Sequence, residues 1–285
     1  MTNAPLTVKL PAIVFTDLDG TLLDHNTYDW QPARPALEKL NAMNIPVVFN
    51  TSKTRAELLY WQKKTGNRHP FIVENGSAIF IPNHYPQATN NPGDCECIEL
   101  GIKRSDILRW LQQNALAFGD CYKSFVDLSV NELVQLTDLP PEQAQLALQR
   151  EYSEAVHWLG DEKKKQLFIQ AAMESGFRVL VGGRFIHLLG CSDKGKASAA
   201  LLSHLNNLGI FGHQSSSENE QHALTTISCG DSPNDIDMLQ WSDLAILVRS
   251  HKPAPPVKHK NLIYTQALGP AGFAEAINSL TFVVQ

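Results

Sequence analysis

Two pairs of aspartates, each following an apolar run, could carry chemistry in this chain of 285 residues. Asp17 and Asp19, separated by one residue, directly follow the apolar run at 11–16. Asp231 and Asp235 stand in a second such segment, GDSPND, after another apolar run. An aspartate at a strand end often only forms a turn, but crowded carboxylates repel one another unless a divalent cation lies between them. Oxygen ligands without His or Cys favour Mg²⁺, so the two pairs indicate a magnesium site that can hold phosphate.

A hydroxyl group and an ammonium group occupy similar positions. Thr51 and Ser52 follow the apolar run at 45–49, and Lys194 precedes a stretch with helical periodicity. Taken alone, Thr51 could equally cap the helix expected near Thr54, and a lysine at a helix start is usually solvated. Ligands of open α/β sheets bind beyond the carboxyl ends of the strands, so we expect these groups and the acidic pairs to meet in one crevice.

Alternating strand and helix patterns separate the residues that carry this chemistry. Apolar, β-branched runs predict buried strands, and apolar residues at three- and four-residue spacing predict helices. The expected strands are 11–16, 45–49, 71–73, 225–228 and 244–248, and the expected helices are 35–43, 54–64 and 194–208. This alternation produces a parallel sheet, and the turn at 74–77 before AIFIP adds a hairpin at its edge. The predicted fold class is α/β, a doubly wound, mostly parallel, Rossmann-like sheet.

The pattern changes between residues 84 and 189. Pro86, Pro92 and Gly93 interrupt the chain, and the regular alternation stops. Helices are expected at 103–116, 141–150 and 161–175, and paired strands at 178–181 and 184–189. We therefore expect a catalytic core made of residues 1–83 and 190–285, with an α+β cap domain for substrate specificity, residues 84–189, inserted between its halves.

Composition and charge exclude several classes of function. The 24 basic and 29 acidic residues give a net charge of -5 without a concentrated basic stripe, so no nucleic-acid partner is expected. No apolar run reaches the ~18 residues that span a membrane. The first residues resemble no signal peptide and the cysteines are odd in number, which favours a cytoplasmic protein with reduced thiols. The sequence specifies no oligomeric state.

Four segments resemble, in their order along the chain, the motifs of the haloacid dehalogenase-type phosphatases. They are DLDGT at 17–21, Thr51 at the end of an apolar strand, Lys194 in DKGKA, and GDSPNDIDML at 230–239. Five further segments, in both the core and the cap, are similar to the family of mannosyl-3-phosphoglycerate phosphatases. They are NTSKTRAEL at 50–58, FIVENGSAIFIP at 71–82, REYSE at 150–154, GGRFIHLLG at 182–190 and GPAGFAEAI at 269–277.

The resemblance implies a Mg²⁺-dependent phosphomonoester hydrolase that works through an aspartyl-phosphate intermediate. Asp17 would be the nucleophile that attacks phosphorus, and Asp19 would protonate the leaving alkoxide and later deprotonate water. The carboxylates of Asp17 and Asp231 and the main-chain carbonyl of Asp19 would ligate the metal. Asn234 and Asp235 would orient these ligands.

The same resemblance assigns the groups that bind phosphate. Thr51, with the main-chain amide of Ser52, would bind the phosphoryl oxygens. Lys194 would neutralise the charge that spreads over them, and Lys196 is the competing lysine.

Substrate selection would come mainly from the cap. Arg150 and Arg184 could each bind the carboxylate of a phosphoglycerate in a bidentate manner. The candidates for contacts with sugar hydroxyls are Glu154 and His187 in the cap and Lys53, Glu74 and Asn75 in the core. His187 alternates with apolar residues, so a histidine with only a structural role is equally consistent with the pattern.

The implied reaction removes phosphate from 2-O-mannosyl-3-phosphoglycerate and yields mannosylglycerate. Two alternatives keep the chemistry and change the substrate: another sugar-phosphate phosphatase, such as one for glucosyl-3-phosphoglycerate, or a phosphomutase. Dehalogenation fits less well, because Asp19 supplies an acid that an alkoxide needs and a halide does not. A non-catalytic sensor of phosphorylated metabolites is the alternative from a different class, and the complete set of catalytic residues argues against it.

Overall fold

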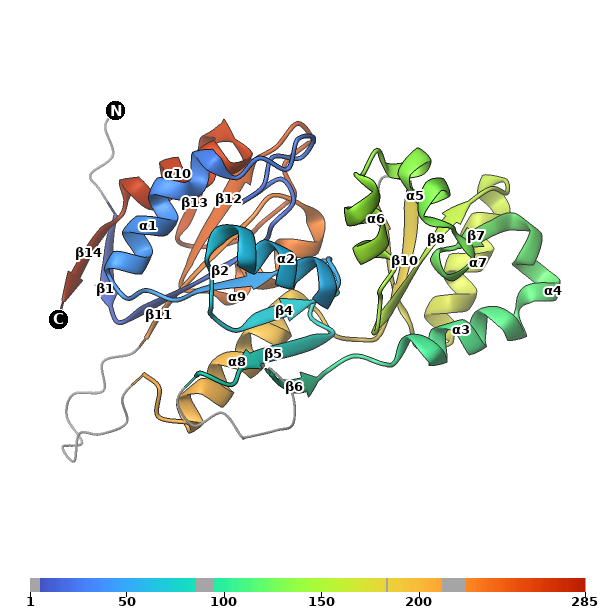
Figure 1. The fold of residues 1–285 in the computed structure, drawn as a ribbon, viewed down its shortest axis with the longest axis horizontal. Helices are drawn as coiled ribbons and strands as arrows, with labels where there is room; N and C mark the ends of the chain where they lie inside the picture. Colours follow the sequence, from blue (N-terminus) through green and yellow to red (C-terminus); the bar gives the residue numbers. More distant parts are fainter. Residues whose placement is uncertain (1–5, 86–94, 183, 212–223, 285) are drawn as a thin grey trace.

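The computed structural model describes residues 6–85, 95–182, 184–211 and 224–284 (Figure 1). Within these ranges the chain forms a sheet of eight strands, an antiparallel sheet of four strands and a two-stranded ribbon. The eight-stranded and four-stranded sheets, each with its own helices, lie at opposite ends of the molecule in Figure 1. We call the first lobe the core and the second the cap.

The core sheet is mostly parallel. Its strands, in spatial order, are β13 (Leu262–Leu268), β12 (Leu244–Arg249), β11 (Thr225–Gly230), β2 (Ala12–Thr16), β3 (Val47–Asn50), β4 (Phe71–Val73), β5 (Ala78–Pro82) and β6 (Cys95–Glu99). Strands β13 to β4 run parallel, whereas β5 and β6 are antiparallel to their neighbours. All five residues of β2 are buried, as expected for a strand covered on both faces. The predicted fold class is confirmed.

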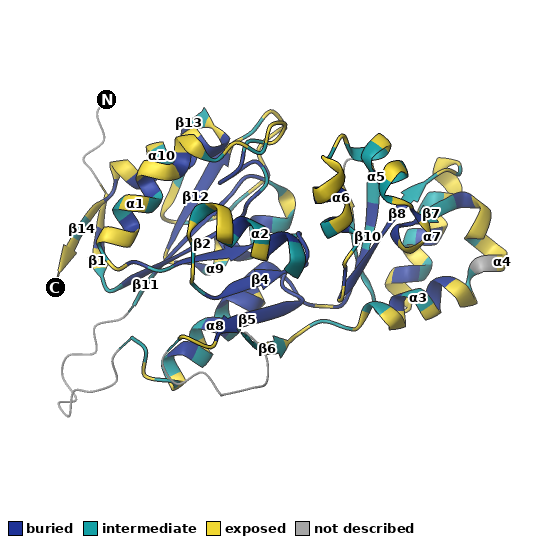
Figure 2. Cartoon of the chain, viewed as in Figure 1, coloured by how far each residue is buried: buried dark blue, intermediate teal, exposed yellow. Residues whose placement is uncertain are grey.

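Two layers of helices enclose the core sheet. One layer consists of α1 (Arg34–Ala42), α2 (Arg55–Thr65) and α10 (Gly269–Ser279), and the other of α8 (Lys194–Asn207) and α9 (Ile236–Trp241). Successive side chains of β2 point to opposite layers, Val14 to the first and Phe15 to the second. Figure 2 shows the central strands of the core sheet buried and the outer helix faces exposed, so the sheet is the centre of the hydrophobic core.

A parallel ribbon of β1 (Thr7–Leu10) and β14 (Thr281–Val284) joins the two ends of the chain. The sequence pattern predicts neither strand. Figure 1 places both strands at the end of the core that faces away from the cap. Short 3₁₀ turns occur at Gln31–Ala33, Gly119–Cys121, Phe125–Asp127 and Pro233–Asp235.

The cap is an antiparallel sheet with helices packed against it. Its strands, in spatial order, are β7 (Tyr122–Ser124), β8 (Ser153–Trp158), β10 (Phe185–Leu189) and β9 (Arg178–Gly182). Its helices are α3 (Arg104–Gln113), α4 (Ala115–Phe118), α5 (Val130–Thr137), α6 (Pro141–Ala147) and α7 (Glu162–Glu174). The sequence pattern does not predict β8. Four of its residues are buried in succession, so the strand lacks the polar-apolar alternation of a half-exposed strand.

The point at which the chain first passes from the core to the cap differs from the sequence prediction. Strand β6 falls inside the predicted cap segment 84–189, but it pairs with β5 in the core sheet, so the hairpin of β4 and β5 is not at the edge. An added Cβ at Gly190 would lie 3.0 Å from the nitrogen of Ile102. The two segments that connect the core to the cap are therefore in contact. We propose that the inserted domain begins after β6 and that these segments form its hinge.

Candidate active site

Three carboxylates and one ammonium group converge beyond the carboxyl ends of the core strands. Asp17 follows β2 and Lys194 opens α8. Asp231 and Asp235 follow β11. The Lys194 Nζ atom lies 2.7 Å from Asp17 Oδ1 and 2.6 Å from Asp235 Oδ1. One carboxylate oxygen from each of the three aspartates lies within 4.8 Å of the other two.

The charges of this acidic cluster interact strongly because all four residues are buried. Burial raises the pKa of Asp17 to about 7, although the charge of Lys194 acts in the opposite direction. Burial, followed by repulsion from Asp235 and Asp17, raises the pKa of Asp231 to about 8. Burial alone would lower the pKa of Lys194, but the two adjacent carboxylates raise it. The cluster therefore carries more negative charge than one lysine balances.

The donor atoms of the cluster fit a hard divalent cation. They are all carboxylate oxygens, the ligands that Mg²⁺ prefers. Both oxygens of Asp235 are already engaged, Oδ1 by Lys194 and Oδ2 by the N–H groups of Asp231 and Ser232 at 3.0 Å each. Asp17 and Asp231 would therefore be the better ligands for a metal ion, and Asp235 positions the loop that carries Asp231.

Gly20 allows the loop after β2 to approach Asp231. Its φ of +82° lies in the left-handed region, and an added Cβ would lie 2.6 Å from Asp231 Oδ2. The neighbouring Thr21 hydroxyl donates to Asp231 Oδ1 at 3.4 Å. The Gly-Thr pair thus aligns the two loops that would hold the metal, and Thr21 was not singled out from the sequence.

Asp19 lies beside the cluster and pairs with Lys53. The Lys53 Nζ atom lies 2.9 Å from Asp19 Oδ2 and 3.5 Å from Glu57 Oε1. Burial opposes the charge of Lys53, yet these two carboxylates raise its pKa. The other oxygen, Asp19 Oδ1, is buried and has no hydrogen-bond partner among the described residues. That oxygen is available for proton transfer with a bound substrate.

Thr51 is fixed by the loop after β3. Its N–H donates to the carbonyl of Ile72 at 3.1 Å, and its hydroxyl accepts from the N–H of Lys53 at 3.3 Å. Thr54, rather than Thr51, caps α2, because its hydroxyl accepts from the N–H of Glu57 and the Glu57 carboxylate accepts from the N–H of Thr54. The capping box expected from the sequence is confirmed. Thr51 is therefore not occupied as a helix cap.

Lys194 is positioned by groups around the start of α8. Asp193 caps this helix by accepting the N–H of Lys196 at 2.7 Å. The side-chain amide of Asn50 donates to the carbonyl of Lys194 at 2.9 Å and to Ser198 Oγ at 3.0 Å. Lys196 is 69% exposed and lies outside the cluster. The sequence missed Asn50, although an asparagine that ends an apolar strand beside Thr51 was a usable signal.

The turn between β4 and β5 crosses the start of α8. Glu74, Asn75 and Gly76 have consecutive positive φ values of 48°, 60° and 90°. An added Cβ at Gly76 would lie 2.2 Å from the carbonyl oxygen of Asp193. The amide of Asn234 donates to Asn75 Oδ1 at 2.9 Å. The turn therefore contacts both the helix that carries Lys194 and the loop that carries Asp231.

Glu74 and Arg150 connect the cap to the core. The Glu74 carboxylate accepts the main-chain N–H groups of residues 151–152 at 2.8 and 3.2 Å, and the hydroxyl of Ser153. Arg150 donates to the carbonyl of Ser52 at 2.9 Å and to Ser153 Oγ at 2.9 Å. Binding of substrate by either side chain would require these contacts to break. The structure therefore favours a role in positioning the cap over the predicted role in substrate binding.

Glu154 is buried and fully engaged within the cap. Its Oε1 accepts from the hydroxyl of Ser124 and from the N–H of Val126, the latter at 3.0 Å. Its Oε2 pairs with Arg104. Neither oxygen is available for a sugar hydroxyl in this arrangement, so the contacts favour a structural role over the predicted one.

The two remaining cap candidates differ in exposure. Arg184 is exposed, and its guanidinium contacts the carbonyl of Leu136 and lies 3.3 Å from Asp138 Oδ2. His187 lies on β10, where burial, followed by the charge of Arg150, lowers its pKa to about 3. Its Nδ1 atom is buried without a hydrogen-bond partner among the described residues. His187 is therefore neutral near pH 7 and cannot pair with a carboxylate by charge.

Comparison with known proteins agrees with this fold and site. The haloacid dehalogenase-like hydrolase family matches residues 14–92, which include Asp17, Asp19 and Thr51. A phosphatase of the haloalkanoate (HAD) superfamily from Bacteroides thetaiotaomicron has a similar structure, with a TM-score of 0.64 at 16% identity over 98% of this chain and 96% of that chain. The chain belongs to the haloacid dehalogenase-like hydrolases.

Relatives at higher identity narrow this class. The chain is 37% identical over 274 residues to a glucosyl-3-phosphoglycerate/mannosyl-3-phosphoglycerate phosphatase of Methanococcoides burtonii, covering 94% of this chain and 96% of that protein. It is 38% identical over 251 residues to a mannosyl-3-phosphoglycerate phosphatase of Pyrococcus horikoshii, covering 86% of this chain and 94% of that protein. The chain belongs to the family of these two proteins and is a phosphatase. The resemblance drawn from its motifs is confirmed.

Proposed function

We propose that the protein is a Mg²⁺-dependent phosphomonoesterase that forms an aspartyl-phosphate on Asp17. The observation that carries the proposal is the convergence of three carboxylates around Lys194 beside an acid, Asp19, with one unpartnered oxygen. Mg²⁺ held by the carboxylates of Asp17 and Asp231, with the carbonyl of Asp19, would neutralise the charge of the phosphoryl group.

In the first step the carboxylate of Asp17 attacks phosphorus. The contact with Lys194 at 2.7 Å holds this carboxylate in place, and the charge of Lys194 favours its ionised form against the effect of burial. As the new oxygen–phosphorus bond forms, the bond to the substrate alcohol breaks, and the departing alkoxide takes the proton of Asp19. Lys53 orients Asp19 through its other oxygen at 2.9 Å.

In the second step Asp19 is ionised and stabilised by Lys53. It accepts a proton from a water molecule as that water attacks phosphorus, and the bond to Asp17 breaks. Inorganic phosphate is released and both carboxyl groups return to their initial states. Thr51 and the amide of Ser52 bind phosphoryl oxygens in both steps, and Lys194 balances their charge.

We infer that the substrate is a 2-O-glycosyl-3-phosphoglycerate. The mannosyl compound is the first candidate and the glucosyl compound is the second. The five segments that resemble mannosyl-3-phosphoglycerate phosphatases and the names of both relatives support the mannosyl compound. The name of one relative also includes the glucosyl compound. A cap that closes over the core provides the means of selection, since the motif residues would treat any phosphomonoester alike.

A phosphate-release screen tests this function. The purified chain is assayed against mannosyl- and glucosyl-3-phosphoglycerate, 3-phosphoglycerate and a panel of hexose phosphates, with and without Mg²⁺. We expect a glycosylated phosphoglycerate to be the best substrate, and chelation to abolish turnover. Removal of the nucleophile by Asp17→Asn should lower kcat at least about a thousandfold, whereas Asp120→Asn, at an exposed position, should not. Normal turnover by Asp17→Asn would refute the nucleophile assignment.

We also propose that the protein acts in the cytoplasm. Within the described chain Cys97, Cys121, Cys191 and Cys229 are free thiols, which fits a reducing compartment. No helix within the described ranges combines the length and apolar character needed to cross a bilayer.

A further inference from the structure

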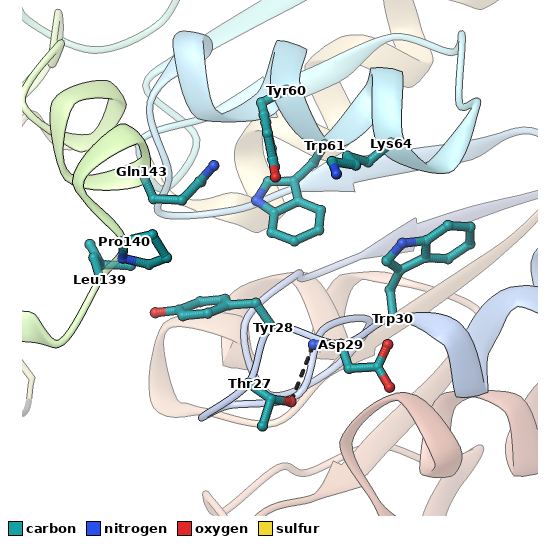
Figure 3. Close-up of a pocket in the computed structure, with 10 residues that line it drawn as sticks. All are labelled: Thr27, Tyr28, Asp29, Trp30, Tyr60, Trp61, Lys64, Leu139, Pro140 and Gln143. Atoms are coloured by element: carbon teal, nitrogen blue, oxygen red, sulfur yellow. Dashed lines mark hydrogen bonds between the residues drawn. The ribbon is translucent and has the colours of Figure 1, made fainter.

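A pocket of about 270 Å³ lies between the core and the cap, and its lining includes none of the acidic cluster (Figure 3). The core contributes residues from the loop after β2 and from α2, and the cap contributes the residues around the start of α6. The principal lining side chains are Tyr28, Trp30, Tyr60, Trp61, Pro140 and Gln143. Its volume is slightly below the ~300–1,000 Å³ of sites for whole ligands, which suits a single ring-sized group.

The pocket adjoins the group that protonates the leaving alcohol. The Tyr28 ring lies against Lys53, with 5.0 Å between the Lys53 Nζ atom and the ring centroid. Lys53 in turn contacts Asp19 at 2.9 Å. Because the leaving oxygen must face Asp19, the organic part of the substrate extends from phosphorus toward this side. The pocket is therefore on the side where that part must be held.

The chemistry of the lining suits a sugar ring. Flat aromatic faces pack against the C–H groups of a pyranose, while amide, hydroxyl and indole groups bind its hydroxyls. Trp61 is 6% exposed, and its Nε1 atom is buried without a hydrogen-bond partner among the described residues. Gln143 is 9% exposed, and in Figure 3 its side chain extends from α6 toward Tyr60 and Trp61. Since Nε1 is shielded from solvent, a ligand must turn a neighbouring side chain to reach it.

We propose that this pocket binds the hexose ring of the substrate, with Trp61 Nε1 and the Gln143 amide as hydrogen-bonding partners and Tyr28 as the wall nearest the phosphate. The assignment rests on the proposed function, because it takes Asp19 as the acid. The assignment also makes substrate recognition depend on the position of the cap relative to the core, since Pro140 and Gln143 are cap residues.

The test separates sugar recognition from phosphate chemistry. In an Asp17→Asn background, which should bind esters without turnover, calorimetry gives the affinities for mannosyl-3-phosphoglycerate and 3-phosphoglycerate. We expect the glycosylated ester to bind at least about tenfold tighter. Gln143→Met and Trp61→Phe, which remove one polar group each and keep most of the volume, should each reduce that ratio about fivefold. Gln145→Met, at an exposed position of the same helix, is the matched control and should leave it unchanged.

Each outcome decides the assignment. A ratio near one in the parent, or a ratio that neither pocket substitution changes, would overturn it and leave the pocket as a gap between lobes. Equal losses of affinity for both esters would overturn it as well, because a sugar site cannot affect a ligand without sugar. Failure of the proposed function would appear separately, as absence of phosphate release by the wild-type chain from the glycosylated esters.

Discussion

The Lys194 ammonium is fully buried and lies within hydrogen-bond distance of two carboxylates. Burial of an isolated ammonium ion would be prohibitive, and so would burial of the aspartates without it. Burial is the main cause of the raised pKa values of Asp17 and Asp231, and repulsion among three aspartates that outnumber the lysine adds to it. The same charge imbalance that would destabilise a structural core makes this crevice a good binding site for a cation.

His187 gives a prediction for the effect of pH on stability. Its pKa falls from 6.5 to about 3 on folding, so between these values the unfolded chain binds a proton that the folded chain does not. The free energy of unfolding should therefore decrease as pH falls from 6.5 toward 3, with no further contribution below that range. In His187→Gln this part of the pH dependence is absent. Urea unfolding at several pH values, compared between the two proteins, measures it.

The expected difference between wild type and His187→Gln amounts to a few kcal/mol across this range, since each pKa unit corresponds to about 1.4 kcal/mol. The histidine proton resonances offer an independent check, because the His187 signal should not titrate near pH 6.5. Unfolding curves that stay parallel at every pH would contradict the prediction.

Among the elements, the turn between β4 and β5 contacts three segments around the site. Through Gly76 it touches the start of α8, through Asn75 the loop after β11, and through Glu74 the segment that enters β8. Three successive residues with positive φ fold the chain tightly enough to make these contacts. We infer that this turn fixes the relative positions of the cap, the helix that carries Lys194 and the loop that carries Asp231.

Substitution of Gly76 tests the importance of that turn. Alanine at Gly76 must adopt a left-handed conformation and meets the Asp193 carbonyl at 2.2 Å. Gly66→Ala is the matched control, since its φ is also positive at +74° but no atom lies within 4 Å. We expect Gly66→Ala to lower the free energy of unfolding by about 1 kcal/mol. Gly76→Ala should cost a further ~1–3 kcal/mol and reduce phosphate release about tenfold.

Both quantities are measurable by urea unfolding and by a phosphate-release assay. Equal losses of stability in the two variants would show that the close approach of Gly76 to Asp193 has no energetic consequence. Unchanged phosphate release in Gly76→Ala would show that the turn does not position Lys194.

At the scale of the whole molecule, the core and the cap have separate hydrophobic clusters. The core clusters surround Val14 and Phe15, whereas the cap clusters surround Phe168 and Leu133. Contacts between the lobes include the polar ones of Glu74 and Arg150, and Tyr152, just before β8, packs in the core cluster. Polar interfaces of this kind allow lobes to move relative to one another. We therefore expect the cap to open and close as a unit and to unfold separately from the core.

Phe168→Ala tests this independence. Phe168 is fully buried on α7, with four aromatic ring centroids at 5.3–5.5 Å, so its removal should destabilise the cap by about 3–5 kcal/mol. Hydrogen exchange followed by mass spectrometry should become faster in β8 and β10 and stay unchanged in β2 and β3. Leu167→Ala, at a position 50% exposed on the same helix, should change neither lobe. Equally faster exchange in both lobes would indicate a single cooperative unit.

By itself, the sequence determined the α/β class, most strand and helix positions and the family. These properties depend on local information: apolar periodicity, the Thr54–Glu57 capping box, and motifs in which a few adjacent residues carry the chemistry. The convergence of the aspartates with Lys194 could also be anticipated, because parallel strands bring their carboxyl ends to one edge of the sheet.

Only the tertiary structure decided what the longer side chains contact. Glu74, Arg150 and Glu154 have the residue types of substrate ligands, but the charged groups of Glu74 and Glu154 are engaged by cap residues, and that of Arg150 by the carbonyl of Ser52 in the core. The same holds for β6, whose sequence does not reveal that it pairs with β5, and for the pocket beside Tyr28, whose walls come from both lobes. Contacts between residues far apart in the chain depend on how the cap packs on the core, and no local pattern encodes that geometry.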